Sequence, residues 1–135
     1  MPQNDSLTSR RRVSSGSPYE GKIGICRAIR TGNIITVSGT APIAPDGNTS
    51  AVGDAYGQAK RCIEIIKTAI EELGGTLEHV VRTRMMITDA GLWEEVGRAH
   101  GEFFGTIRPA ATIVVVKGFV RDDWLVGIEA DAIVG

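Results

Sequence analysis

Apolar residues recur every three or four positions between residues 54 and 73, which is the spacing of one face of an α-helix. Charged residues fill the opposite face, so the segment predicts an amphipathic helix packed on a core. Asp54 is suited to cap its start, and the pair Gly74-Gly75 is suited to end it. The apolar stripe consists of Ala55, Ala59, Cys62, Ile63, Ile66, Ala69, Ile70 and Leu73.

A second helix is predicted after Asp89, whose side chain can accept hydrogen bonds from the first turn. Gly105 is expected to end it. The apolar residues at helical spacing, which predict its inner face, are Leu92, Val96, Ala99 and Phe103.

Five segments have the composition or the alternation of β-strands. Residues 23–30 and 33–38 are joined at Thr31-Gly32, a tight hairpin connection. Residues 112–117 and 125–134 form two further candidates. In residues 80–88 the side chains alternate, with Val81, Thr83, Met85 and Ile87 predicted on the core side and Arg82, Arg84 and Met86 on the other side.

This order of elements predicts an α+β fold in which both helices pack on one face of a sheet. The run from Ile113 to Val116 is apolar at every position, as is much of residues 34–37, and such strands are typically buried on both faces. Two helices can cover only one face. We therefore expect a second copy of the chain to cover the other, so the pattern itself predicts a homo-oligomer.

The length of 135 residues fits one domain. Residues 1–16 are polar, which predicts a disordered tail before a single folded domain over residues 17–135. Within this tail, Arg10-Arg11-Arg12 is expected to form a solvated, mobile arm, with a binding patch as the alternative.

The formal net charge of −1 gives no field that attracts nucleic acid or an anionic membrane, so neither is an expected partner. No apolar run is long enough to span a bilayer, and the N-terminus lacks the apolar region of a signal peptide. Cys26 and Cys62 are too few for a disulfide framework, which favours free thiols in a reducing cytoplasm.

General catalytic motifs are absent from the sequence. There is no Gly-x-Ser-x-Gly elbow, P-loop or dinucleotide-binding glycine motif. His79 and His100 are far apart in sequence and lack partner ligands, so we expect surface or helix-flank residues and neither a metal site nor a cofactor.

Four separated motifs together resemble the RidA/YjgF family of reactive-intermediate deaminases. They are Ser17-Pro18-Tyr19, residues 32–39 with the sequence GNIITVSG, residues 107–116 with the sequence IRPAATIVVV, and residues 126–132 with the sequence VGIEADA. The resemblance implies a single mixed sheet of the chorismate-mutase-like fold, assembled as a homotrimer around a central axis. It also implies ligand clefts between neighbouring subunits and cofactor-free hydrolysis of small imines or enamines.

The resemblance also implies site residues. Glu129 would order or activate a water molecule, Ser38 would follow the second strand, and Tyr19 would line the cleft. The family's Pro-Ala-Arg-[Ser/Thr] motif, whose arginine binds the substrate carboxylate, has Ala111 at the arginine position. The remaining ligand-binding candidates are Gly39, Arg84, Gly97 (often asparagine in the family), Thr112 and Ile113 (often cysteine).

Alanine at position 111 offers neither charge nor donor, so 2-imino acids are expected to bind poorly. Arg84 or Arg108 could supply a substitute cation. Strand parity also allows a structural ion pair, either Arg84 with Glu129 or Arg82 with Asp131.

The resemblance and the missing arginine leave two hypotheses. The first is a deaminase-like hydrolase acting on an imine or enamine other than the usual 2-imino acids. The second is a trimer that binds or senses a metabolite without turnover. A ribonuclease or translation inhibitor has less support, because there is neither a basic groove nor a histidine pair.

Overall fold

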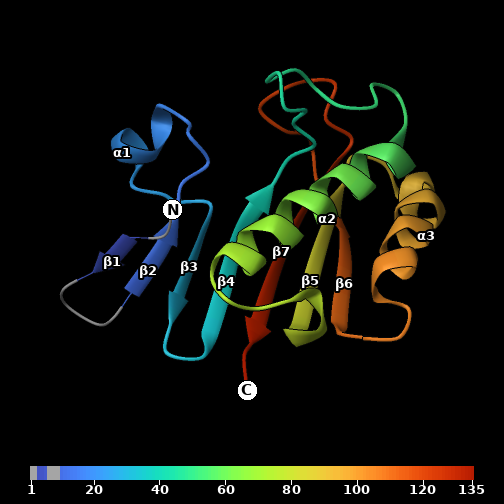
Figure 1. Ribbon diagram of the computed structural model, residues 1–135. Coiled ribbons are helices and arrows are strands. Elements are labelled where there is room, and N and C mark those ends of the chain that lie inside the picture. Colours follow the sequence, from blue (N-terminus) through green and yellow to red (C-terminus); the bar gives the residue numbers. More distant parts are fainter. Residues whose placement is uncertain (1–2, 6–9) are drawn as a thin grey trace.

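The structure, a computed structural model, describes residues 3–5 and 10–135 (Figure 1). Within these residues, seven strands form one sheet in the order β1-β2-β3-β4-β7-β5-β6. All neighbours pair antiparallel except β5 and β6, which are parallel, so the predicted α+β fold with a mixed sheet is confirmed. The strands are β1 (Gln3–Asp5), β2 (Arg10–Val13), β3 (Ala28–Thr31), β4 (Ile34–Thr40), β5 (Val80–Ile87), β6 (Ala110–Val115) and β7 (Val126–Ile133).

Two long helices lie on the same face of the sheet (Figure 1). α2 (Ala55–Glu72) crosses the middle strands, and α3 (Trp93–Phe104) connects β5 to β6 and lies at that end of the sheet. A short helix, α1 (Tyr19–Ile23), lies at the opposite end, near β2 and β3. Two single 3₁₀ turns, Leu77–His79 and Ala90–Leu92, precede β5 and α3.

α2 forms where its apolar stripe predicts it. The Asp54 carboxylate accepts a hydrogen bond from the Gly57 amide at 3.0 Å, which satisfies one of the free donors of the first turn. Residues of the predicted stripe are buried against the sheet, where Ile63, Ile66 and Ile70 meet Ile35 and Ile128 in one core. This burial removes most of the apolar surface of the helix from water and fixes it across the sheet.

The N-terminal end of β5 departs from the predicted alternation of buried and exposed side chains. The pairing of β5 with β7 shifts register between Val80 and Arg82, a β-bulge. Val80 therefore takes the core position, and Val81, which we predicted on the core side, is 44% exposed. From Thr83 to Ile87 the predicted alternation is confirmed, because the bulge lies before it.

The N-terminal segment also differs from expectation. Arg10-Arg11-Arg12 belongs to strand β2 and not to a mobile arm, because Val13 is buried in the core and the backbone of β2 pairs with β3. Residues 1–2 and 6–9 of the predicted disordered tail lie outside the described residues. The strand predicted from residue 23 begins later, because Gly24, with φ of 83°, ends α1 at that point.

The face of the sheet opposite α2 and α3 has no helix over it in Figure 1. Edge strand β6 is exposed at every residue except Thr112, with Ile113 and Val114 at 37% and Val115 at 57%. These are residues whose sequence predicted burial on both faces. A single copy of the chain leaves that prediction unfulfilled.

We expect Asp54→Ala to lower the free energy of unfolding by about 1 kcal/mol, because it removes the cap of α2. Urea denaturation measures this change. Glu72→Ala, at the exposed opposite end of the same helix, is the control and should change the stability less. Equal losses in the two variants would contradict a capping role for Asp54.

Candidate functional site

An ion pair occupies the uncovered sheet face. The β5–β7 register places Arg84 opposite Glu129, and Nη1 of Arg84 lies 2.7 Å from Oε1 of Glu129. The structure thus contains the first of the two ion pairs that strand parity allowed. Asp131 lies opposite Arg82, but Nη2 of Arg82 donates to the Thr112 hydroxyl at 3.4 Å. Within residues 3–5 and 10–135, the Arg82–Asp131 ion pair does not form.

This ion pair changes what both side chains can do. Arg84 and Glu129 are 42% and 37% exposed, so the pair is open to solvent and contributes little to stability. Arg84 is not a free cation for a ligand, because Glu129 already neutralises it. Glu129 keeps one oxygen, Oε2, without a partner among the described residues.

Ser38 and Gly39 lie in a bulge where the β4–β7 pairing shifts register between Val37 and Thr40. The Ser38 hydroxyl donates to the Cys26 carbonyl oxygen at 2.7 Å. A bulge of this kind turns backbone groups out of the strand ladder, so other groups must satisfy them.

Arg27, to which the sequence analysis gave no role, provides hydrogen bonds to the polar groups of this bulge. Its Nη2 donates to the carbonyl oxygens of Ser38 and Gly39 and to the Thr40 hydroxyl, at 2.7, 2.8 and 2.8 Å. Burial lowers the pKa of its guanidinium, and its Nε is buried without a partner among the described residues. Arg27 therefore fixes the geometry of two predicted site residues.

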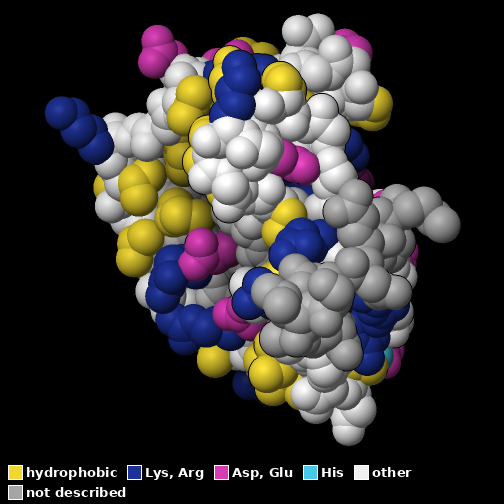
Figure 2. All heavy atoms as spheres, turned by 90° about the vertical axis from the view of Figure 1, so that its left-hand side faces the viewer, with side chains coloured by type: hydrophobic (Ala, Val, Ile, Leu, Met, Phe, Trp, Pro, Cys, Tyr) yellow, Lys and Arg dark blue, Asp and Glu magenta, His cyan; other side chains and the backbone are white. Residues whose placement is uncertain are grey.

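Tyr19 lies on α1 and is 60% exposed. The surface near this helix carries a hollow of about 440 Å³. Figure 2, seen from this side of the molecule, shows basic and acidic side chains close to hydrophobic ones. The hollow is lined by Arg10, Arg12, Glu20, Gly21, Gly24, Ile25, Cys26 and Ile29.

The candidates on β6 point to two different faces. The parallel register pairs Ala111 with Thr83 and Ile113 with Met85, both of which face the helices. Thr112 pairs with Arg84 and so faces the uncovered side. Arg108 precedes this strand in an exposed turn with φ of 56°.

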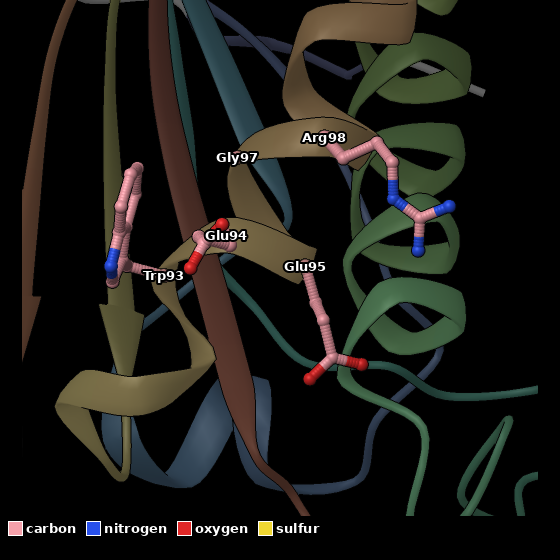
Figure 3. A pocket seen from close by; sticks show the side chains of 5 residues that line it. All are labelled: Trp93, Glu94, Glu95, Gly97 and Arg98. Atoms are coloured by element: carbon pink, nitrogen blue, oxygen red, sulfur yellow. The ribbon is translucent and has the colours of Figure 1, made fainter.

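The first turns of α3 border a hollow of about 530 Å³, lined by Trp93, Glu94, Glu95, Gly97 and Arg98 (Figure 3). Gly97 leaves space here, since a Cβ at this position would meet nothing within 4 Å. Arg98 points toward α2, where its guanidinium lies 4.0 Å from the ring centre of Tyr56. Trp93 points the other way, toward the strands, and is 57% exposed.

His100, which we expected on the surface or at a helix flank, belongs to α3 and is half-buried on the side of this helix that meets β5. Its Nε2 and the hydroxyl of Thr83 share a hydrogen bond of 2.8 Å, and its ring packs on Phe104 with ring centres 4.6 Å apart. Burial lowers the pKa of His100 below its usual value. His79 lies at a helix flank as predicted, where its Nδ1 accepts from the Thr76 amide at 3.0 Å.

The described chain contains no group of three or more His, Cys, Asp or Glu side chains placed to hold a metal ion. Of the helices in residues 3–5 and 10–135, none has both the length and the apolar character required to cross a membrane.

One protomer does not bring the predicted site residues together. Tyr19, Ser38 and Gly39 belong to the half of the sheet beside α1 and β3, whereas Gly97, Ala111 and Ile113 belong to α3 and β6 at the other end (Figure 1). Arg84 and Glu129 lie on strands between these groups. The distribution results from the strand order and not from the bend of any single loop.

Acid should destabilise the protein through His100. The unfolded chain binds a proton on this imidazole at higher pH than the folded chain, so the free energy of unfolding falls as the pH drops below about 6.5. We expect His100→Gln to reduce this fall between about pH 7 and about pH 5, as measured by urea denaturation at each pH. Phe104→Leu, which changes only the packing of the ring, should keep the wild-type slope. Identical slopes in all three proteins would contradict the assignment.

Known proteins match most of this chain. The family model described as endoribonuclease L-PSP matches residues 24–134. The protein SCO2049 of Streptomyces coelicolor is 39% identical over 122 residues, which cover 90% of each protein. The RutC family protein PYRAB12510 of Pyrococcus abyssi is 36% identical over 107 residues, covering 79% of this chain and 82% of that protein.

A solved structure matches the fold as well. The crystal structure of Rv2704 from Mycobacterium tuberculosis, a member of the YjgF/YER057c/UK114 family, has a TM-score of 0.83 and 40% sequence identity, covering 93% of this chain and 100% of that one. Tyr19 lies before the segment that the family model matches, whereas the other site candidates lie within it. On this evidence, the chain belongs to the RidA/YjgF family, whose model is described as endoribonuclease L-PSP.

Proposed function

We propose that this protein is a homotrimer whose ligand clefts form between neighbouring protomers, and that it hydrolyses small imines or enamines other than the usual 2-imino acids. The observation that carries the proposal is the separation of the site candidates. Ser38 and Gly39 lie toward one end of the sheet, and Gly97, Ala111 and Ile113 lie at the other. A neighbouring copy is the simplest means of joining the two groups in one cleft.

The surface of β6 supports self-association. Ile113, Val114 and Val115 are exposed on an edge strand, where apolar side chains and unpaired backbone groups face solvent together. Such an edge favours association unless another chain covers it. A second copy supplies complementary apolar positions on the uncovered face, including Ile34 and Ile133.

The proposed chemistry needs one carboxylate and one water molecule. Oε2 of Glu129 accepts a proton from water while Arg84 holds Oε1, and the oxygen of the water adds to the imine carbon. The protonated carboxyl group then gives that proton to the imine nitrogen, so the carbinolamine formed has one hydroxyl and one amino group on that carbon. On its collapse the hydroxyl proton moves to the nitrogen, the C–N bond breaks, and a carbonyl compound and ammonia are released without a cofactor or metal.

The residue at position 111 sets the substrate class. A guanidinium would bind a carboxylate through two charge-assisted hydrogen bonds, and the methyl group of Ala111 makes none. Losing such contacts weakens binding by about tenfold to over a hundredfold. The preferred substrates therefore lack an α-carboxylate.

A non-catalytic function is the alternative, in which the trimer binds or senses a metabolite. The Arg84–Glu129 ion pair favours it, because the guanidinium already engages one carboxylate oxygen and leaves only Oε2 to meet a water molecule. A metabolite that raises the melting temperature and is recovered unchanged would support this function. Ammonia release from imines generated in place by an oxidase, faster than without the protein, would support hydrolysis.

Ala111→Arg tests the substrate class. We expect this variant to gain hydrolysis of iminopropionate by about tenfold to a hundredfold, because the guanidinium restores the carboxylate contact. Ammonia release during oxidation of alanine by an amino-acid oxidase measures the rate. Ala110→Arg is the matched control, since that residue pairs with Arg82 and faces the other side of β6. No gain in Ala111→Arg, or an equal gain in the control, would overturn the assignment of this position.

Analytical ultracentrifugation tests the assembly. We expect the wild-type protein to sediment as a trimer and Val114→Lys to sediment as a smaller species, because a charge at this face cannot be buried without a partner. Thr68→Lys, which adds the same charge to the exposed side of α2, should remain a trimer. A compact wild-type monomer would rule out an inter-subunit cleft.

A further inference from the structure

His100 lies beside the position where the family's arginine would stand. Ala111 pairs with Thr83 across β5 and β6, and Thr83 shares its hydrogen bond with Nε2 of His100. Gly97 lies one turn earlier on the same side of α3, without a side chain of its own. Thr83 is therefore a neighbour of both Ala111 and the imidazole of His100.

The hydrogen-bond partners fix which nitrogen of His100 carries the proton. Thr83 is buried, and its hydroxyl has no other acceptor among the described residues, so we assign the hydroxyl as the donor and Nε2 as the acceptor. A neutral imidazole that accepts at Nε2 carries its proton on Nδ1. Nδ1 has no partner in the described part of the chain. One N–H donor thus remains available on His100.

We propose that Nδ1–H of His100, oriented by Thr83, is the polar anchor of the ligand cleft in place of an arginine at position 111. The inference rests on the proposed cleft, but it concerns binding and does not require turnover. His100 binds the ligand directly in this proposal, whereas Thr83 is a positioning residue that sets the tautomer and the direction of the ring.

This anchor selects a different class of ligand from that of a guanidinium. A neutral N–H group can donate to a carbonyl oxygen, an imine nitrogen or a hydroxyl group, but it brings no charge to balance a carboxylate. Two guanidinium groups of the protomer are already engaged, since Arg84 is paired with Glu129 and Arg98 stacks on Tyr56. The cleft should therefore bind neutral acceptors in preference to anions.

Propionamide and propionate form a matched pair of probes, because they share a carbon chain and differ in the charge of the head group. We expect propionamide to shift the Nδ1 resonance of His100 in nitrogen-15 NMR spectra of the full-length protein. We expect propionate to bind at least about fivefold more weakly, a difference that corresponds to roughly one hydrogen bond. In Ala111→Arg, the order of affinities should reverse.

Two substitutions separate binding from structural support. In His100→Gln the amide oxygen can take the place of Nε2 and accept the hydrogen bond from Thr83, but no N–H group remains at the position of Nδ1. This variant should keep its melting temperature within a few degrees and bind propionamide about fivefold more weakly. His100→Asn keeps a donor near Nδ1 and should retain more of the affinity. His79→Gln, which changes the other histidine, should bind like the wild type.

These measurements test ligand binding by His100 and do not depend on catalysis. An unmoved Nδ1 resonance with propionamide, wild-type affinity in His100→Gln, or preference of the wild type for propionate would each overturn it and leave His100 a packing residue. Absence of ammonia release would count against the hydrolase alone, because the NMR titration reports binding.

Discussion

The antiparallel pairing of β5 with β7 determines which side chains of these two strands lie on each face of the sheet. On the helix side it places Met85 beside Ile128, under α2, in the continuous core. On the uncovered side the same register sets Arg84 opposite Glu129 at 2.7 Å. Because side chains alternate along a strand, a slip of one residue would bury the charges and expose the core. The core therefore holds the ion pair in place, although the pair itself is exposed to solvent.

The strand order then determines how far apart the remaining site candidates lie. β5 and β7 occupy positions between β4, which carries Ser38, and β6, which carries Ala111. Each strand adds a fixed separation of about 4.8 Å, so no loop movement can bring β4 and β6 of one chain together. In the proposed trimer, β4 of one protomer would meet β6 of another, which connects the exposed apolar edge of β6 with the proposed cleft.

The sequence predicts the features of this fold that follow from helical spacing or from strand alternation. α2 and its capping residue follow from the apolar stripe. Strand parity allowed Arg84 to pair with Glu129, and the β5–β7 register places the two residues opposite each other. The exposed position of Val81 could not be predicted, since a bulge in the β5–β7 pairing leaves no mark in the alternation itself. β2 was missed because three consecutive arginines conceal the pairing of its backbone with β3.

Two polar residues to which the sequence analysis assigned no site role share one property. Arg27 and His100 acquire their roles from segments distant in sequence, the Ser38–Gly39 bulge in one case and Thr83 in the other. Their residue types alone do not distinguish them from ordinary surface residues. Ala111 differs from these two residues, because the sequence itself shows its departure from the family motif. Only the fold shows that Thr83 is its neighbour on β5.

The C-terminal end of α2 ties the N-terminal strand to the rest of the chain. Guanidinium groups of Arg11 on β2 and Arg30 on β3 both donate to the carbonyl oxygen of Leu73, at 3.2 and 2.7 Å. They also complement the negative end of the helix dipole. Because Leu73 follows Arg11 by 62 positions, β2 lacks this contact during synthesis until α2 has been made.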